Sequence, residues 1–392
     1  MWAFVAALLS HSSFAPDEFY QSAEPSLCLL DLPCISTWEW TVPAPIRTSL
    51  PLYLYSGFYR AVTALHPLLS VVPAVPFPLL TVVLAALLSA VPLHAQFRCS
   101  SSSLISSTWF LFYAGCRSYS NAVEMALCNV VFSLLHSPSP PPYPLLGVLC
   151  ALAITVRFSA GVFFLPLFLH HLISLLLPSH TLSRASISAA LSFLLRFFPP
   201  LLLSLALLHA LDMGHYDMPL LSSPITWNNI EFNVLTNSSE LYGVHPWHWY
   251  LSACLPQIVG VYLPFLVHSL ATTDPTPRLS AARLTAVFYV AVHSLNGHKE
   301  LRFLLPVLPL LLLDASASAE RLNLKRDGRL LGALRAVNLL AFLFFSLVWQ
   351  SGSIYSMYQI GSLIPPDATA VSVDLVTSCH ATPAHTHLFR PG

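Results

Sequence analysis

Runs of apolar residues recur along nearly the whole chain, and this pattern constrains the fold more than any other feature of the sequence. Of the 392 residues, 55% are hydrophobic and only 9% are charged, which is more apolar surface than one soluble core can bury. Because a backbone inside a bilayer must satisfy its own hydrogen bonds, such runs indicate membrane-spanning helices. A barrel would need short alternating strands, and the sequence has none. We therefore predict an all-α, polytopic membrane protein.

Counting the apolar runs gives about eleven transmembrane helices in one continuous domain over residues 1–350. Several runs are shorter than the ~20 residues that a perpendicular span needs, so we expect some helices to be broken or only partly exposed to lipid. Residues 51–70 hold three tyrosines, Arg60 and His66, which is typical of a helix lying in the membrane interface. The predicted spans are 1–14, 72–93, 103–116, 122–136, 144–158, 160–178, 197–211, 250–270, 284–297, 302–316 and 331–350.

The basic residues predict which loops share a side of the membrane. If 51–70 does not span, most arginines and lysines outside the motifs below fall on one face, which the positive-inside rule makes cytoplasmic. The opposite face, which we take as lumenal, carries a first loop at 15–70, a large loop at 212–249 and a C-terminal segment at 351–392. Nearly all the mixed-charge and aromatic motifs fall on this second face, so we expect an active site there.

Composition disfavours two kinds of partner. The formal net charge is zero and no basic tract is present, so we expect no nucleic acid. The eight cysteines lack the spacing of metal ligands, and most read as small buried hydrophobic residues, although Cys28 and Cys34 could pair if their loop faces an oxidising lumen. The tail CHATPAHTH (379–387) contains a possible metal set, but we favour a folded lumenal flap. We therefore predict no metal site.

The first loop begins FAPDEFYQSAEP, with Asp17 and Glu18 just after the first apolar run. Adjacent residues on a helix point about 100° apart, so one carboxylate can face a cavity while the other caps the helix or forms an ion pair. The simpler interpretation is an acidic pair that complements a helix dipole. The alternative is a general base, since a carboxylate at the membrane surface can take the proton of an attacking hydroxyl. We select Asp17 as the catalytic candidate and Glu18 as the second choice.

The segment NGHKELRFLLPVLPLLLL sets four polar side chains against an apolar wall. A lone basic residue at a helix end is commonly a snorkelling anchor. Four polar groups within five residues, so close to hydrocarbon, favour a function. Basic groups here suit a lipid-linked phosphate, because arginine offers a two-pronged fork and lysine a point charge while the lipid tail stays in the bilayer. We predict that His298, Lys299 and Arg302 bind such a phosphate, with Glu300 orienting them.

A third block, NSSELYGVHPWHWY, is rich in aromatic residues and histidine. One interpretation is an aromatic belt at the headgroup level. Its HxxH pair lacks a third metal ligand at a useful spacing, and aromatic faces beside imidazole donors suit a sugar at least as well. The candidates for sugar binding are Tyr242, His245, Trp247 and His248.

Two arginines stand at the edges of apolar runs on the same predicted face. Arg117 lies in CRSYSNAVE and Arg157 in AITVRFSAG. Singly, each is typical of a structural ion pair in a membrane protein. Near a basic cluster they can also bind phosphate, so we add both to the phosphate-binding candidates.

Taken together and in this order, PDEFYQS, TWEWT, PIR, RSYSNAVE, YGVHPWHWY with LPQIVG, and HKELRFLLPVLP resemble the sequence blocks of the lumenal mannosyltransferases that use dolichyl-phosphate-mannose. The resemblance covers nearly the whole chain, and HKELRF is its most specific element. It implies the GT-C fold. Within the family, HPWHWY, TWEWT and SCHATPAHTH resemble the enzymes that add the third, α1,2-linked mannose to the GPI core, and the N-glycan α1,6-mannosyltransferases are the second choice.

The resemblance implies an inverting transfer in the endoplasmic reticulum membrane, with a lipid-linked donor, a GPI glycolipid acceptor, surrounding membrane lipids and no cofactor. The protein must neutralise charge on the departing phosphate and remove the acceptor's proton from the opposite face of the sugar. It also implies that 351–392 is truncated relative to the family. Two other classes remain open: a transporter or scramblase, which would favour charges near mid-span and two related halves, and a non-catalytic subunit.

Overall fold

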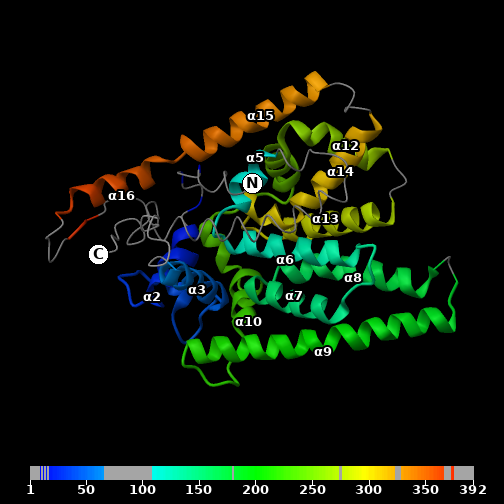
Figure 1. The fold of residues 1–392 in the computed structure, drawn as a ribbon, viewed down its shortest axis with the longest axis horizontal. Helices are drawn as coiled ribbons and strands as arrows, with labels where there is room; N and C mark the ends of the chain where they lie inside the picture. The colour runs from blue at the N-terminus through cyan, green and yellow to red at the C-terminus, as the bar shows by residue number, and fades with distance from the viewer. Residues whose placement is uncertain are drawn as a thin grey trace.

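The computed structural model describes residues 17–65, 108–178, 181–272, 276–322, 328–365 and 372–374, with Leu9, Ser12 and Ala15. Every regular element in this part of the chain is a helix, as predicted (Figure 1). The α-helices are α2 (Glu24–Cys28), α3 (Leu50–Leu65), α5 (Trp109–Gly115), α6 (Ser120–Leu135), α7 (Tyr143–Val156), α8 (Ala160–Leu176), α9 (Arg184–His215), α10 (Ile225–Ile230), α11 (Leu255–Val259), α12 (Leu263–Ala271), α13 (Pro277–Leu295), α14 (Leu308–Arg321), α15 (Gly328–Leu347) and α16 (Gly352–Leu363). The short 3₁₀ and π helices are η1 (Phe19–Ala23), η2 (Trp38–Trp40), η6 (Glu231–Leu235), η7 (Ser238–Tyr242), η8 (Tyr250–Cys254), η9 (Gly260–Tyr262) and η10 (Leu301–Val307).

Four helical segments of the described chain are long and apolar enough to cross a membrane. They are Arg184–His215, Tyr250–Ala271, Leu301–Arg321 and Gly328–Leu347. The helices α6, α7 and α8 are apolar but shorter, as the short runs of the sequence predicted. Of the predicted spans, 72–93 and nearly all of 1–14 lie outside the described residues, and 103–116 is described only from residue 108.

Helix α9 is much longer than its predicted span of 197–211. A capping box starts it early, because the Ser183 hydroxyl accepts a hydrogen bond from the backbone N–H of Ser186 and the Ser186 hydroxyl accepts one from the backbone N–H of Ser183. The serine-rich first turns are too polar to read as a span. Only 11% of the most apolar stretch of this helix is buried inside the protein, so its leucine-rich surface can contact lipid.

The helices α6, α7 and α8 lie between α9 and α13 (Figure 1). Helix α7 packs closely on α9, and the close approach depends on Gly147. A Cβ atom at this position would lie 2.5 Å from the backbone oxygen of Phe197 and 3.0 Å from the backbone nitrogen of Leu201. Glycine is therefore the only residue that fits without moving backbone.

The predicted span 250–270 is broken into four short pieces, η8, α11, η9 and α12. Proline occupies the first turn of both α11 and α12, where its missing N–H costs nothing. Gly260 between them has φ of 58°, a left-handed conformation that glycine adopts without strain. The expectation of broken helices is confirmed at this segment.

The first loop is an ordered unit that covers one end of the bundle. Cys28 and Cys34 form a disulfide with a Cα–Cα distance of 5.4 Å, so the pairing that the sequence left open is present. The buried indole of Trp40 donates a hydrogen bond to the backbone oxygen of Tyr20, which fixes η2 against η1. Asp212 at the end of α9 accepts hydrogen bonds from the Thr48 and Ser49 side chains and attaches the loop to the bundle.

Candidate functional site

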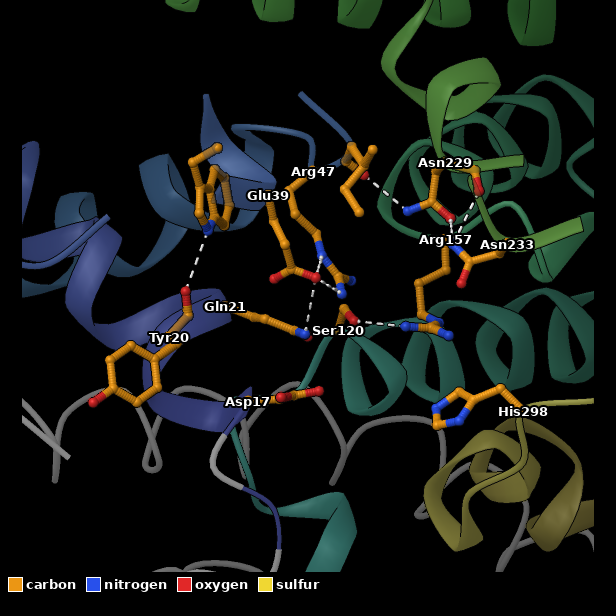
Figure 2. Close-up of polar contacts among 12 residues, drawn as sticks. Asp17, Tyr20, Gln21, Glu39, Arg47, Ser120, Arg157, Asn229, Asn233 and His298 are labelled. Atoms are coloured by element: carbon orange, nitrogen blue, oxygen red, sulfur yellow. Dashed lines mark hydrogen bonds and ion pairs between the residues drawn. The ribbon is translucent and has the colours of Figure 1, made fainter. Parts of the chain in front are cut away.

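A pocket of about 370 Å³ lies where the first loop meets the turn between α7 and α8 and the segments around residues 229–245 and 293–303. Side chains from these distant parts of the sequence surround a common space (Figure 2). Among the sequence-predicted candidates, those that line it are Asp17, Arg157, Tyr242, His245, His298, Lys299, Glu300 and Arg302. The structure therefore brings the first acidic motif and the HKELRF motif together.

Arg302 joins these two motifs directly. Its Nη2 atom donates to the Asp17 carboxylate, 285 residues away along the chain. The same guanidinium donates to both oxygens of Glu300, with Nε–Oε2 and Nη2–Oε1 distances of 2.7 and 2.8 Å. Arg302 is buried and holds two carboxylates at once. The Nε and Nη2 atoms of Arg302 thus already bind protein carboxylates. We predicted that Arg302 binds phosphate, but its contacts favour a role in holding Asp17 in position.

The two carboxylates are ionised because of this arginine. Burial raises the pKa of Asp17, but the positive charge of Arg302 outweighs it and lowers the pKa below its usual value. Burial likewise opposes ionisation of Glu300, and the charge and hydrogen bonds of Arg302 bring the pKa of this carboxyl well below its usual range. Both side chains therefore carry negative charge at neutral pH.

His298 extends the same network toward the aromatic block. Its Nε2 lies 3.1 Å from Glu300 Oε1 and its Nδ1 lies 3.1 Å from the backbone oxygen of Gly243. Both ring nitrogens thus face acceptors, which favours the doubly protonated ring. Burial lowers the pKa of His298, but the hydrogen bond and charge of Glu300 exceed that effect, so the pKa is raised. The site thus stabilises an imidazolium.

Lys299 is buried at the pocket wall and is held by backbone oxygens. Its Nζ donates to the backbone oxygen of His245 at 2.9 Å and to that of Asn296. Burial lowers the pKa of the amine. Lys299 therefore joins the aromatic block to the HKELRF turn and also adds a positive group to the lining.

Arg157 is the extended residue that ends α7, and its guanidinium lies 5.4 Å from the ring centroid of Phe303 in the pocket lining. Its Nε lies 3.1 Å from Glu124 Oε2, and its Nη1 donates to the Ser120 hydroxyl at 3.1 Å. Ser159 in turn donates to the other oxygen of Glu124 at 2.6 Å. This network orients the guanidinium while leaving part of it at the pocket surface.

Two of the predicted site residues pair with each other outside the pocket lining. Arg117 Nη1 lies 3.1 Å from Glu18 Oε2, and both side chains are only 2% exposed. The second oxygen of Glu18 accepts from the backbone N–H of Ser118 at 3.2 Å. Asp17 and Glu18 thus diverge as helical neighbours do: one faces the pocket and the other forms a structural ion pair.

The aromatic block divides in the same way. Tyr242 and His245 line the pocket, and His245 stacks on Trp249 with a centroid distance of 4.5 Å. Trp247 and His248 are not part of the lining; Trp247 is 68% exposed and His248 Nδ1 lies 3.0 Å from the Ser252 hydroxyl. The part of the block up to His245 thus contributes to the pocket, whereas Trp247 and His248, which we predicted to bind sugar, lie outside its lining.

Sequence reasoning missed a group of polar lining residues on the first loop, α10 and η6. Arg47 Nη2 lies 2.8 Å from Glu39 Oε1, and Gln21 donates to the same oxygen at 3.4 Å (Figure 2). Asn229 and Asn233 complete this side of the lining. Glu39 in TWEWT and Arg47 in PIR belong to the same loop as Asp17. This shared loop was the signal in the sequence that could have identified them as lining residues.

The charge of the lining is positive in balance. Four basic side chains face three acidic ones; they are Arg47, Arg157, Lys299 and Arg302 against Asp17, Glu39 and Glu300. The imidazolium form of His298 adds to the excess. Within the described residues no group of three metal-ligating side chains gathers. The tail set at 379–387 lies outside them. Such a pocket can hold an anion beside an ionised carboxylate.

The sequence is similar to those of several known proteins. The chain is 28% identical to GPI alpha-1,2-mannosyltransferase 3 of Danio rerio over 98% of this chain and 70% of the relative. It is 28% identical to the Homo sapiens protein of the same name, over 98% and 68%, and 29% identical to GPI mannosyltransferase 3 of Schizosaccharomyces pombe, over 98% and 79%. No solved structure matches. The model of the Alg9-like mannosyltransferase family matches residues 1–389, so the resemblance read from the motifs is confirmed: the chain is a glycosyltransferase that belongs to this family.

Proposed function

We propose that this protein transfers an α1,2-linked mannose from dolichyl-phosphate-mannose to the mannosylated core of a GPI precursor. The relatives that share most of its length carry the name of the third GPI mannosyltransferase. The observation that carries the chemistry is the meeting of Asp17 with the HKELRF cluster across one pocket. A lipid-linked phosphate sugar needs a base and a basic cluster at a membrane surface, and this pocket has both.

Asp17 is the proposed general base. The acceptor hydroxyl attacks the anomeric carbon, the bond from that carbon to the phosphate oxygen breaks, and the hydroxyl proton passes to Asp17. Dolichyl phosphate departs from the opposite face, so the configuration inverts. A phosphate is already a good leaving group, and the attacking hydroxyl becomes acidic as its new bond forms, so an ionised carboxylate of low pKa suffices.

In this proposal Lys299 and Arg157 donate hydrogen bonds to the departing phosphate, and His298 stabilises it through its positive charge, because both of its ring N–H groups are already directed at Glu300 and Gly243. All three line the pocket, and the surrounding acceptors hold each in place before substrate arrives. Arg302, whose Nε and Nη2 atoms already bind carboxylates, positions Asp17 through a partly buried ion pair, and Glu300 orients both Arg302 and His298. Tyr242 and His245 are proposed to contact the sugars. No cofactor is needed for this scheme.

We place the pocket on the lumenal side of the endoplasmic reticulum membrane, in a multi-pass bundle of about eleven transmembrane helices. The positive-inside distribution of basic residues supports this orientation. The pocket also sits at the N-terminal end of the candidate span Leu301–Arg321, where a lipid-linked head group would meet the protein while its tail stays in the bilayer.

The test is rescue of GPI synthesis in cells that lack the third GPI mannosyltransferase. We expect the wild-type chain to restore surface GPI-anchored proteins and to consume the precursor that carries two mannoses. Asp17→Asn removes the proton acceptor but keeps the shape, and we expect mannose transfer to fall by at least about 10²-fold with unchanged expression.

The matched control is Asp31→Asn, a carboxylate of the same loop that is exposed and lies in a left-handed conformation that asparagine tolerates. It should leave transfer unchanged. Near-normal transfer by Asp17→Asn would remove this residue from the role of base. A wild-type chain that rescues N-glycan assembly and leaves the two-mannose GPI precursor in place would refute the proposed acceptor.

A further inference from the structure

A second hollow of about 440 Å³ adjoins the catalytic pocket on the outer side of the first loop. Trp38, Ile46 and Phe232 line both spaces and form the wall between them. We call this hollow the outer groove, bounded further by Asn228, Glu231 and Thr236. A molecule lying in it would therefore contact three side chains that also line the catalytic pocket.

The outer groove differs from the catalytic pocket in charge. None of its lining residues is lysine, arginine or histidine, whereas the catalytic pocket holds four basic side chains. A phosphate would find no cation in the groove. Its charged residue is Glu231, which is exposed and sits beside an amide and a hydroxyl. The rest of the lining is mostly apolar, with Val42, Pro43 and Ala44 beside the three shared side chains. The groove therefore suits a neutral ligand that has both an apolar face and hydroxyls that donate hydrogen bonds.

Trp38 gives the groove a flat apolar face. It is 44% exposed although it lies between residues of an ordered loop, and it rests on Phe232 with a ring centroid distance of 5.0 Å. Its neighbour Trp40 is buried and carries the structural role of the WEW motif. A large exposed indole supported from behind is available to a ligand.

The two segments that bear the groove are fixed to one another. Asn228 donates to the backbone oxygen of Pro45 at 3.0 Å, and Asn229 donates to that of Ile46 at 2.8 Å. The Thr236 hydroxyl donates back to the backbone oxygens of Glu231 and Phe232. The shape of the groove thus exists before any ligand binds, which reduces the entropic cost of binding.

We propose that the outer groove binds the neutral mannose residues of the acceptor glycan. A sugar ring has a face of C–H groups that packs on an indole and a rim of hydroxyls that donate to carboxylate and amide oxygens. A lipid tail fits less well, because it would desolvate Glu231 without pairing it. The donor head then occupies the basic pocket, and the acceptor reaches Asp17 over Trp38. This inference rests on the proposed function, since it assumes a mannosylated acceptor.

The test measures steady-state transfer in microsomes with dolichyl-phosphate-mannose and a two-mannose GPI acceptor. Trp38→Ala removes the stacking face, and we expect the KM for acceptor to rise by about 10-fold while the KM for donor changes by less than about twofold. Trp38→Phe should keep most of the affinity, and Trp38→Leu should lose it as Ala does. Trp227→Ala, an exposed tryptophan of α10 outside the groove, is the matched control.

An unchanged acceptor KM in Trp38→Ala would overturn the inference. Equal behaviour of the Leu and Phe variants would also overturn it, because that result is expected for contact with a lipid tail. A separate arm measures binding of a soluble α-linked dimannoside to the purified protein by saturation-transfer NMR. Binding that depends on Trp38, in a chain that does not mannosylate GPI, would refute the proposed function and keep the groove as a mannoside site. Transfer without any effect of Trp38 on acceptor KM or dimannoside binding would refute the groove alone.

Discussion

The substitution Glu300→Gln tests whether the HKELRF cluster works as one electrostatic unit. Glu300 accepts two hydrogen bonds from Arg302 and one from His298. Glutamine keeps the size of the side chain but removes its charge. A hydrogen bond to a charged partner is worth ~1 kcal/mol more than a neutral one, so three such bonds predict a loss of ~3 kcal/mol from the organisation of the site. If that loss is felt in the transition state, kcat falls by about 10²-fold.

The pH dependence of this variant is a sharper test than its rate. The pKa of His298 is raised because Glu300 stabilises the charged ring against the opposing effect of burial. The imidazolium is therefore present below the raised pKa and is lost as pH rises through it, so phosphate stabilisation and transfer should fall on the alkaline side. Glu300→Gln removes the stabilising charge and leaves burial and the charge of Arg302, which both lower the pKa of His298, opposed only by the hydrogen bond to Gly243. We expect the alkaline limb of the kcat profile to move to lower pH.

The assay is mannose transfer from dolichyl-phosphate-mannose in microsomes across about pH 5.5–9, which extends from about one unit below the ordinary histidine pKa to about 2.5 units above it. A second variant, His298→Gln, identifies the titrating group. It should abolish the alkaline limb, and adding Glu300→Gln to it should shift nothing further. The reasoning is refuted if Glu300→Gln lowers kcat without moving the limb, or if the shift persists when His298 is absent.

Two more outcomes follow from particular contacts. Arg302→Lys keeps the positive charge, but lysine cannot hold Glu300 with two hydrogen bonds and Asp17 with a third. We therefore expect kcat to fall by roughly 10–100-fold with little change in the KM for donor. A rise confined to the KM for donor would instead mean that Arg302 binds the phosphate. Gly147→Leu forces side-chain atoms against the backbone of α9 and should lower the free energy of unfolding by about 2 kcal/mol or more, seen as a lower Tm in detergent. Gly161→Leu on α8 has open space around its Cβ position and should leave the Tm unchanged. Equal Tm values for the two variants would show that α7 and α9 do not need the close approach.

The sequence predicted helices correctly where the length of an apolar run determines the helix. Helices α6, α7, α8 and α15 fall close to their predicted ranges, because each is a run of apolar residues bounded by proline, serine or glycine. Helix α9 was predicted too short, since its serine-rich start is polar and its capping box acts through hydrogen bonds that hydropathy does not register. The break at Gly260 was expected only in general, because a left-handed glycine has no hydropathy signature either.

The candidate site was predictable in its motifs and less so in its pairings. Sequence reasoning selected Asp17 and the HKELRF cluster by charge density near hydrocarbon, and the structure brings them into contact. It could not assign partners to the arginines. Arg117 and Arg302 are both conspicuous basic residues at the ends of apolar runs, yet one is paired with Glu18 outside the pocket and the other with Asp17 inside it. The difference depends on which carboxylate each can reach in three dimensions.

The adjacent pair Asp17–Glu18 shows how one local rule yields two roles. Their side chains diverge by about 100°, so a helical turn at the start of η1 sends one carboxylate to the pocket and the other into the bundle. Glu18 and Arg117 are nearly inaccessible and neutralise each other, which anchors the turn. Asp17 keeps 31% of its side chain exposed while Arg302 holds it. The general base that we propose must be both held in place and accessible, and the buried Glu18–Arg117 pair beside Asp17 holds the turn without lining the pocket.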